Sequence, residues 1–493
     1  MRRFWFWVAA MAVLVVLGSY GVRAIAFAMV PDAPIERYGG FHVGLSLPIP
    51  VVQVAPHWHA IIALWCMLAA LAVCGWQAAR SVATQHQPSL WPIMLGYALV
   101  AGVFTFFSVT LSIDSYYYTA FARLFGVYGI DPYVLVSPIR VADPILAKEY
   151  TLLHNPPFPD PYGPGFTLLA GLVGRLEINA TLWQQLWTWR LISVASCLGI
   201  LAALARLLAR APARERVQRL ALVAFHPLVL YESGAGGHND FLMVAAALWS
   251  YAIVDELPLI AGLLLGAAIS IKYFAAILLP FIAIRAARKN LVAPALIVGL
   301  AVVVPVLCFH PFTFGHTGQT TLAKVGANLS MSLTWLVSLP LLMFKASAAG
   351  AAQPWLDTAL RCIQFAVGAA FLAIILVAAI AYARRAKSAL ILRCVTALLW
   401  SLPALHPWYG IWLAPGAAVR SAWAPYAWWF CALMLLIYAH EAVLPTPVNH
   451  TIFIAIAVVV LAVPIIIARR ATQGLMLPQA PQAAAEPQEG AQA

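Results

Sequence analysis

An aspartate at the end of an apolar run is the first residue whose type and position could do chemistry. Asp114 follows the apolar segment 91–113 and is followed, after one serine, by three tyrosines in "LSIDSYYYTAF". A carboxylate is costly inside lipid, so we expect it at the edge of a bilayer, where it can serve as a general base. The phenol rings of Tyr116 and Tyr117 suit contact with a sugar ring. The structural alternative is that Asp114 only ends a span and the tyrosines form an interfacial aromatic belt.

A glycine-rich stretch carries three further polar residues. "YESGAGGHND" closes another apolar run with His238, Asn239 and Asp240. Polar side chains at this depth are costly and tend to be functional, so we expect a flexible backbone to turn them toward a cavity at the membrane surface. A plain loop with a polar tip is the alternative.

A single lysine lies inside a long apolar run. Lys272 occurs in "AISIKYFAAILLP". We interpret it as a ligand for a phosphate group, because a compact cation at a broken helix suits such a group where the dielectric constant is low. The alternative is that its long side chain reaches the membrane interface.

Aromatic residues complete the set of candidate binding residues. Trp408 and Tyr409 follow His406 in "LHPWYGIW", and Tyr162 lies in "DPYGPGF", a turn just before the chain re-enters lipid. Their rings can contact a sugar, and the alternative for the first cluster is again an interfacial aromatic belt.

The sequence offers no pattern typical of a metal or nucleotide site. No spacing of His, Cys, Asp and Glu indicates a metal site, although Asp114 and Asp240 could share a cation. The seven cysteines lie far apart in apolar runs, without a Cys-x-x-Cys pair, and we interpret them as packing residues. A phosphate-binding glycine loop and a Ser-His-Asp pattern are also missing from the sequence. We therefore expect no metal and no other cofactor.

Composition indicates the elements that must position these residues. Hydrophobic residues make up 63% of the 493 and charged residues only 9%, whereas a soluble domain carries about 25% charged residues. The fold class we predict is an all-α, polytopic integral membrane protein. Since a span needs roughly 20 apolar residues, we expect about 12 transmembrane helices, with a range of 11 to 14.

Charge distribution predicts the orientation. The net charge of +12 comes mainly from arginines in short loops, which is typical of cytoplasmic loops and makes nucleic acid an improbable partner. Arg2 and Arg3 at the start, and five arginines against one glutamate in segment 206–219, mark the inner side. Both termini are then cytoplasmic, and Asp114 and Asp240 fall on the outer face.

The predicted organisation is one transmembrane domain with a tail. Residues 1–472 form the domain, within which 114–165 is a large first extracytoplasmic loop holding five of the 17 acidic residues. Segment 166–176 is too short to span, and segment 257–284 is either one helix or two half-helices broken near Lys272. Residues 473–493, rich in Ala, Gln and Pro, are expected to be a disordered tail.

An ordered set of motifs resembles a known family. Asp114 with its tyrosines, "GIDPY", "YGP", "GGHND" and "KYFAAILLP" occur in this order between residues 114 and 280. Together they resemble bacterial polyprenyl-phosphate-mannose-dependent α-mannosyltransferases of the glycosyltransferase C superfamily, whose members often carry Asn where this chain has Asp131. The resemblance implies a multi-span protein of the bacterial inner (plasma) membrane, with its active site at the outer face. It also implies a polyprenyl-phosphate sugar as donor, Asp114 as catalytic base, and no bound nucleotide or metal.

The chemistry of the residues agrees with that expectation. Inverting glycosyl transfer needs one carboxylate to deprotonate the acceptor hydroxyl, and a departing phosphate needs positive charge rather than an acid. Lys272 can supply this charge, together with His238 or a loop arginine such as Arg123 or Arg140. We predict transfer of a hexose, mannose by resemblance, to a glycan or glycolipid acceptor. Asp240 is the alternative base.

A second function class fits some of the same residues. A transporter or flippase of a lipid-linked sugar would also place charged residues along its path. Such a path needs charges on both sides of the bilayer midplane, whereas the charges here gather at one face. This asymmetry favours the enzyme.

Overall fold

A computed structural model places most of the chain. It describes residues 1–29, 40–43, 47–50, 58–85, 88–108, 112, 114–133, 141–147, 159–312, 331–345, 353, 355–419, 423–441 and 446–472. The predicted tail 473–493, Arg140 and much of the predicted outer loop lie outside these ranges.

The protein is largely helical, as predicted, with one short antiparallel hairpin formed by β1 (Gly40–Val43) and β2 (Leu47–Pro50). The helices of the N-terminal half are α1 (Arg2–Met29), α2 (Trp58–Ala83), α3 (Trp91–Phe107), α4 (Asp114–Gly126), α6 (Pro164–Leu176), α7 (Leu182–Leu207), α8 (Ala213–Ala224), α9 (Pro227–Tyr231), the π-helix η3 (Glu232–Gly236) and α10 (Asp240–Ile253). Those that follow are α11 (Pro258–Ile271), η4 (Tyr273–Leu278), α12 (Leu279–Ala287), α13 (Ala293–Phe309), α15 (Leu333–Lys345), α16 (Trp355–Arg385), α17 (Ser388–Ser401), η5 (Pro407–Trp412), η6 (Ala414–Ala418), α18 (Ala424–Met434), η7 (Leu435–Glu441) and α19 (Thr446–Thr472).

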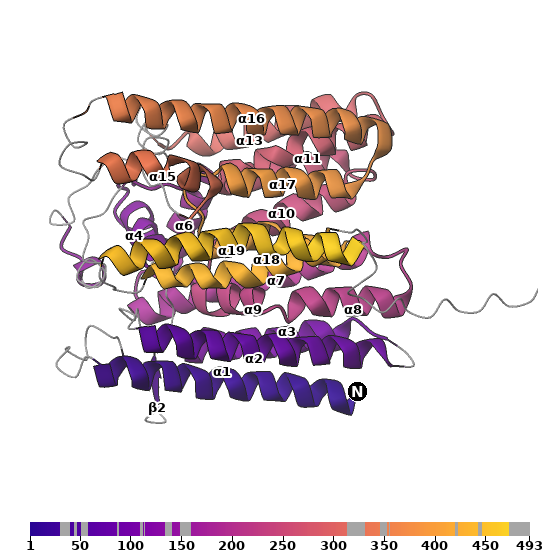
Figure 1. Ribbon diagram of the computed structural model, residues 1–493. Helices are drawn as coiled ribbons and strands as arrows, with labels where there is room; N and C mark the ends of the chain where they lie inside the picture. The colour runs from indigo at the N-terminus through magenta and orange to yellow at the C-terminus, as the bar shows by residue number, and fades with distance from the viewer. Residues whose placement is uncertain are drawn as a thin grey trace, which may run out of the picture.

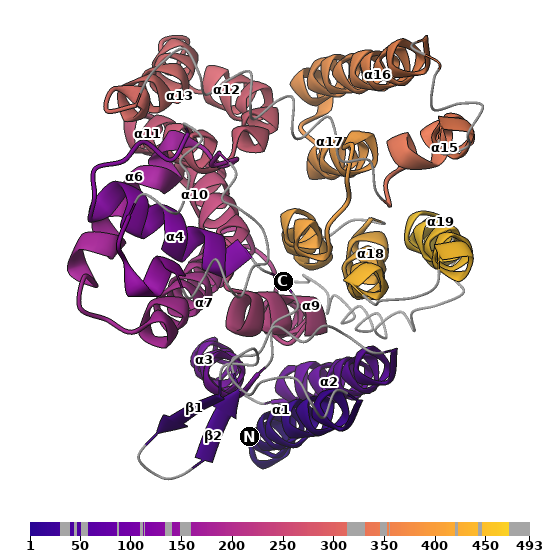
Figure 2. The same ribbon diagram turned by 90° about the vertical axis from the view of Figure 1, so that its left-hand side faces the viewer.

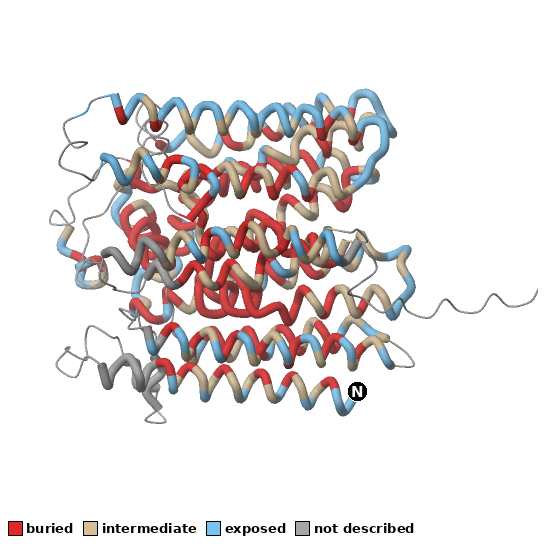
Figure 3. Tube along the Cα trace, viewed as in Figure 1, coloured by how far each residue is buried: buried red, intermediate tan, exposed pale blue. Residues whose placement is uncertain are grey.

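Membrane character follows from length, composition and exposure. Within the part of the chain that the structure describes, five helices are long and apolar enough to cross a membrane, and they lie in α1, α2, α7, α16 and α19. The outer helices α1 and α16 are largely exposed, whereas the central helices are buried (Figure 3). Because α16 exposes large apolar side chains such as Phe365 and Leu372, its outer face suits contact with lipid.

The helices run roughly side by side, so the molecule has two distinct ends (Figure 1). The N-terminus, α8 and the connection between α16 and α17 lie at one end, and α4, α6 and the hairpin lie at the other. Viewed from that other end, α4 and α6 lie over the side formed by α7, α10 and α11, while α15 to α19 form the opposite side (Figure 2). The arginine-rich segments and the predicted acidic loop are therefore separated by the length of the helices.

The segment predicted as the main outer loop begins with a buried helix. α4 packs closely on α6, and the contact depends on glycines: a Cβ at Gly126 would lie 2.1 Å from the Gly171 carbonyl oxygen, and one at Gly174 would lie 2.2 Å from that of Ala122. Small residues let two helix backbones approach this closely. Asp114 is the first residue of α4 and is thereby held by a packed helix pair.

The chain breaks at Lys272, as the half-helix alternative predicted. α11 ends at Ile271, Lys272 has an extended backbone (φ −145°, ψ 124°), and η4 and α12 continue the segment. The interrupted backbone is satisfied locally, because the Gly163 amide donates a hydrogen bond to the Ile271 carbonyl at 3.0 Å. A Cβ at Gly163 would lie 2.2 Å from the Ser270 carbonyl oxygen, so only glycine permits this contact.

Candidate active site

A buried histidine lies between two carboxylates from different helices. His238 Nδ1 is 3.4 Å from Asp114 Oδ2, and His238 Nε2 is 3.2 Å from Glu232 Oε2. The side chains of His238 and Glu232 are fully buried, whereas that of Asp114 is 15% exposed. Asp114 is therefore the accessible end of the chain Asp114–His238–Glu232. The inner end is fixed by Tyr438, whose hydroxyl donates to both Glu232 oxygens at 2.9 and 3.1 Å.

The local backbone explains how His238 reaches this place. Glu232 to Gly236 form a π-helical turn, which widens the helix before it ends. Gly237 has a left-handed conformation (φ 69°) that favours glycine, and it turns the chain so that His238 faces back toward Glu232.

The two carboxylates decide the charge of the imidazole. Burial alone would lower the pKa of His238, but Asp114 and Glu232 outweigh it and raise that pKa to about 9. Burial would likewise raise the pKa of Asp114, but the neighbouring His238 and Lys272 hold it below its ordinary value. At neutral pH the site thus holds an imidazolium beside an ionised Asp114.

The imidazole is covered by an aromatic stack from the C-terminal third of the chain. The ring of Trp408 stacks on that of His238, with centroids 4.3 Å apart, and the ring of His406 stacks on Trp408 at 4.7 Å. Both residues belong to the predicted "LHPWYGIW" cluster. The stack places a large apolar surface beside the charged chain and limits access of water to His238.

A second charged pair lies beside the first. Lys272 Nζ is 2.7 Å from Asp240 Oδ2, and the indole of Trp412 donates to Asp240 Oδ1 at 2.6 Å. The ammonium group also lies 5.5 Å from the ring centres of Tyr162 and Tyr409. Both oxygens of Asp240 therefore have partners, and the lysine is surrounded by aromatic faces that favour a cation.

The loop that holds Tyr162 is fixed by a buried carboxyl group. Asp160 accepts hydrogen bonds from the Tyr162 amide and the Thr167 hydroxyl, both at 2.8 Å, and burial raises its pKa to about 7. The hydroxyl of Tyr133, from "GIDPY", donates to the Tyr162 carbonyl at 2.9 Å. The "GIDPY" and "YGP" motifs are thus joined to each other and to the break at Lys272.

The tyrosines after Asp114 divide into different roles. Tyr116 and Tyr117, both predicted to bind substrate, are buried in α4, and Tyr117 stacks on Phe121. Tyr118 accepts a hydrogen bond from the Asn239 amide at 3.3 Å. The side-chain amide of Asn239 is buried, and neither its nitrogen nor its oxygen has a hydrogen-bond partner among the described residues. Buried amides are seldom left unpaired, so Asn239 is suited to receive a ligand.

Arg190 is a buried cation that the sequence reasoning missed. Its Nη1 donates to the carbonyls of Thr105 and Ser108 at the end of α3, at 2.8 and 3.4 Å. Its Nε and Nη2 have no hydrogen-bond partner in the described ranges. Gly237 lies against the backbone and the Cγ of Arg190, so the turn that carries His238 packs on this part of α7. An arginine inside the apolar run "LWTWRLIS" was the signal that could have identified it.

Other residues were missed or lie elsewhere. Glu232 and Trp412 complete the two charged groups, and the signal for Glu232 was an acid at the end of an apolar run. Arg123, considered as a phosphate ligand, instead pairs with Asp143 at 2.7 Å. No group of three or more His, Cys, Asp or Glu residues in the described ranges is arranged to hold a metal ion, and independence from metal stays a prediction.

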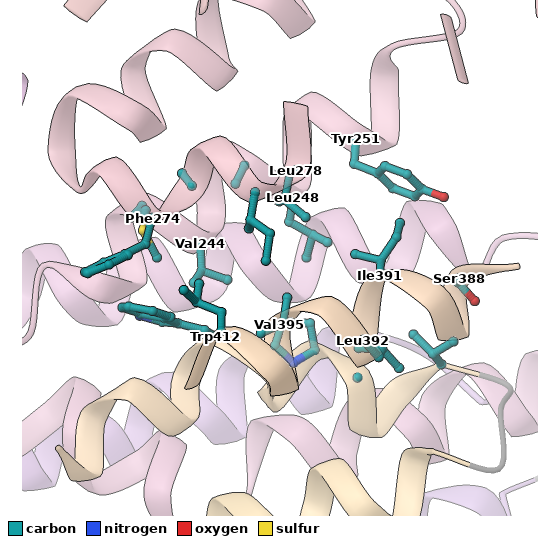
Figure 4. A pocket seen from close by; sticks show the side chains of 18 of the residues that line it. Val244, Leu248, Tyr251, Phe274, Leu278, Ser388, Ile391, Leu392, Val395 and Trp412 are labelled. Atoms are coloured by element: carbon teal, nitrogen blue, oxygen red, sulfur yellow. The ribbon is translucent and has the colours of Figure 1, made fainter. Parts of the chain in front are cut away.

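An apolar cavity of about 140 Å³ adjoins the lysine pair (Figure 4). Trp412 and Phe274 close one end, and Leu248, Leu278 and Ile391 line its length. Its walls come from α10, η4 and α17, and it leads from the site toward Tyr251 and the opposite end of the helices.

Comparison with known proteins gives one result. A family described as "Alpha-(1->6)-mannopyranosyltransferase, N-terminal domain" matches residues 9–288, more than half of the chain. No curated protein and no solved structure matches. The matched region contains Asp114, Glu232, His238 and Lys272, so the charged residues of the site lie inside it. The chain belongs to the alpha-(1->6)-mannopyranosyltransferase family and is a membrane glycosyltransferase.

Proposed function

We propose that the protein transfers mannose from a polyprenyl-phosphate donor to a glycan or glycolipid acceptor at the outer face of the bacterial inner membrane, with inversion. The observation that carries the proposal is a partly accessible carboxylate, Asp114, paired with His238 and lying beside the Lys272–Asp240 pair and an apolar cavity. A lipid-linked donor needs this combination, because its phosphate carries negative charge and its chain is apolar.

Asp114 is the base in this proposal. Its side chain is partly accessible, and its lowered pKa keeps it ionised at neutral pH. Asp240, the alternative base, has both oxygens engaged by Lys272 and Trp412. One carboxylate suffices for inversion, since it takes the proton of the acceptor hydroxyl while the sugar leaves its phosphate on the opposite side.

The leaving phosphate is stabilised by charge rather than by protonation. Lys272 and the imidazolium of His238 come from different elements and supply this charge. Such preorganised groups stabilise the negative charge that develops on the phosphate as the glycosidic bond breaks. We propose that neither a nucleotide nor a metal ion takes part.

Orientation follows from the two ends of the molecule. The N-terminus, α8 and the α16–α17 connection lie at the same end of the molecule (Figure 1), and they carry the arginine-rich segments that the positive-inside rule assigns to the cytoplasm. The Asp114 end then faces outward, with both termini inside. The shorter apolar helices add to the five long ones, and we propose about 12 crossings in total, counted at roughly 20 residues per span or per pair of half-helices.

The apolar cavity supports a lipid-borne donor. It begins at Trp412, the residue that also binds Asp240, and continues between α10 and α17 away from the site. A polyprenyl chain seated there would present its phosphate to Lys272. The family match favours the enzyme over the transporter alternative, because the family is one of mannosyltransferases.

The deciding experiment measures mannosyl transfer from radiolabelled polyprenyl-phosphate mannose. Membranes would carry wild-type protein, Asp114→Asn, Asp240→Asn or the control Asp357→Asn, which changes an exposed acid of α16, at matched expression. We expect Asp114→Asn to lose activity by a factor of about 10² to 10⁴ and Asp357→Asn to keep it. Full activity of Asp114→Asn would remove it as the base, and failure of wild type with this donor would make the donor assignment wrong.

A further inference from the structure

The α16–α17 connection contains a hollow that the mannosyltransferase activity does not use. It has a volume of about 490 Å³, and the α16–α17 connection lies at the end of the molecule opposite to α4 (Figure 1). Four cationic side chains line it: Arg384, Arg385, Lys387 and Arg393. Its remaining lining is apolar, and includes Val377, Ile380, Ala381, Ala389 and Leu390. No acidic residue contributes to the lining, so the hollow is strongly positive.

The charge in this hollow is not compensated by acidic side chains of the described residues, although the Arg393 guanidinium lies 5.4 Å from the ring centre of Trp423. None of the four cations forms an ion pair within the ranges the structure describes. Other arginines near this end do have acidic partners, for example Arg219 with Glu215 at 2.8 Å and Arg285 with Asp255 at 2.5 Å. Four like charges around one hollow repel each other, and an anion placed among them would relieve that repulsion.

The N-terminus of α17 adds to the positive potential. The helix begins at Ser388, and the preceding Lys387 provides no side-chain cap for the first amide groups. Ala386 holds a left-handed conformation (φ 47°) that makes the turn between the helices tight. Uncapped amides and the positive end of the helix dipole favour a bound anion, and Ala389 in this first turn lines the hollow.

The apolar wall indicates what kind of anion fits. Val377 is 66% exposed and Ile380 is 49% exposed, and both line the hollow from α16, a turn or two before Arg384. A soluble phosphate would gain nothing from these side chains, whereas the acyl chains of a phospholipid would cover them. Basic pockets between membrane helices on the cytoplasmic side are suited to anionic head groups.

We propose that the hollow between α16 and α17 binds an anionic phospholipid. The head-group phosphates lie among Arg384, Arg385, Lys387 and Arg393 and against the first amides of α17, and the acyl chains run along Val377 and Ile380. The site is separate from the Asp114 site and does not depend on the mannosyl donor.

The test measures lipid binding to the purified full-length protein by native mass spectrometry. Cardiolipin is the probe because its two phosphates match four cations, and phosphatidylcholine and soluble glycerol phosphate are the comparison ligands. One variant combines Arg384→Gln, Arg385→Gln and Arg393→Gln. The matched control combines Arg2→Gln, Arg210→Gln and Arg214→Gln, three exposed arginines near the same end. Size-exclusion profiles and mannosyl transfer of both variants confirm folding.

We expect wild type and the control variant to bind one cardiolipin with equal affinity. The triple variant of the hollow should bind about 100-fold more weakly, at about fivefold for each charge removed. Equal weakening in both variants would mean a non-specific charge effect and would overturn the proposal. Unchanged binding in the hollow variant, or equally tight binding of phosphatidylcholine, would overturn it as well. Tight binding of glycerol phosphate alone would assign the hollow to a soluble anion instead.

Discussion

The substitution Glu232→Gln tests the buried end of the chain of charged groups Asp114–His238–Glu232. Glu232 is fully buried and 3.2 Å from His238, so the change removes one of the two charges that keep the imidazole protonated. In a medium with an effective dielectric constant of about 20, unit charges at this distance interact by about 332/(20 × 3.2), or about 5 kcal/mol. Asp114 remains at 3.4 Å, and the glutamine carbonyl still offers a dipole, so the net change is smaller. We expect the pKa of His238 to fall by about 1 to 2 units, or about 1.4 to 2.7 kcal/mol.

The expected readout is a shift of the pH profile. A group with a raised pKa is fully protonated below its ordinary value and loses its proton as the pH rises through the raised one, which is about 9 for His238. If the imidazolium assists departure of the phosphate, wild-type transfer falls only above about pH 9. In Glu232→Gln this fall moves to about pH 7 to 8, which makes the variant about two- to tenfold slower at pH 8 but close to wild type at pH 6.

The assay is mannosyl transfer from the labelled lipid donor between pH 6 and pH 10. Glu215→Gln serves as the control, because Glu215 pairs with Arg219 at the opposite end and has no contact with the site. If the activity of Glu232→Gln falls at the same pH as that of wild type, the reasoning is refuted. A loss of activity that is equal at every pH would mean that Glu232 supports the fold rather than the charge of His238.

Two further substitutions test the Lys272 region. Lys272→Met leaves Asp240 buried without its cation, so we expect about 3 to 5 kcal/mol of destabilisation in a thermal unfolding assay. Adding Asp240→Asn should restore stability but not transfer. A normal unfolding temperature of the single variant would contradict the buried pair. Gly163→Ala places a Cβ 2.2 Å from the Ser270 carbonyl oxygen and should displace the Tyr162 loop, lowering transfer by about tenfold or more, whereas Gly299→Ala, with no atom within 4 Å, should leave transfer unchanged. Equal activity of the two alanine variants would show that the loop contact does not position the site.

Much of the fold and part of the site could be predicted from the sequence. The excess of apolar residues predicted membrane helices. The lysine inside an apolar run indicated the break at residue 272, because unpaired backbone groups and a cation both need polar partners inside a membrane protein. Asp114, His238, Asp240 and Lys272 do lie in one cluster, as their polar character at membrane depth predicted.

The pairings could not be predicted from local sequence. His238 meets Asp114 across 124 residues and Trp408 across 170, and such contacts depend on how helices pack rather than on spacing along the chain. Glu232 gave little signal, since only the π-helical turn and Gly237 bring it back to His238. Arg123 was considered as a phosphate ligand because it lies close to Asp114 in the sequence. It pairs with Asp143 instead, and no motif indicates that contact.

The aromatic stack has a consequence for how the enzyme comes into being. Trp408 and Trp412 lie more than 100 residues beyond Lys272, the last charged residue of the site along the chain. During synthesis, Asp114, Glu232, His238 and Lys272 therefore enter the membrane before the rings that cover them exist. Until residues 407–412 arrive, His238 lacks its stacking partner and Asp240 lacks the indole that donates to it. The site is therefore completed late in synthesis, when residues 407–412 and Tyr438 reach the charged residues made earlier.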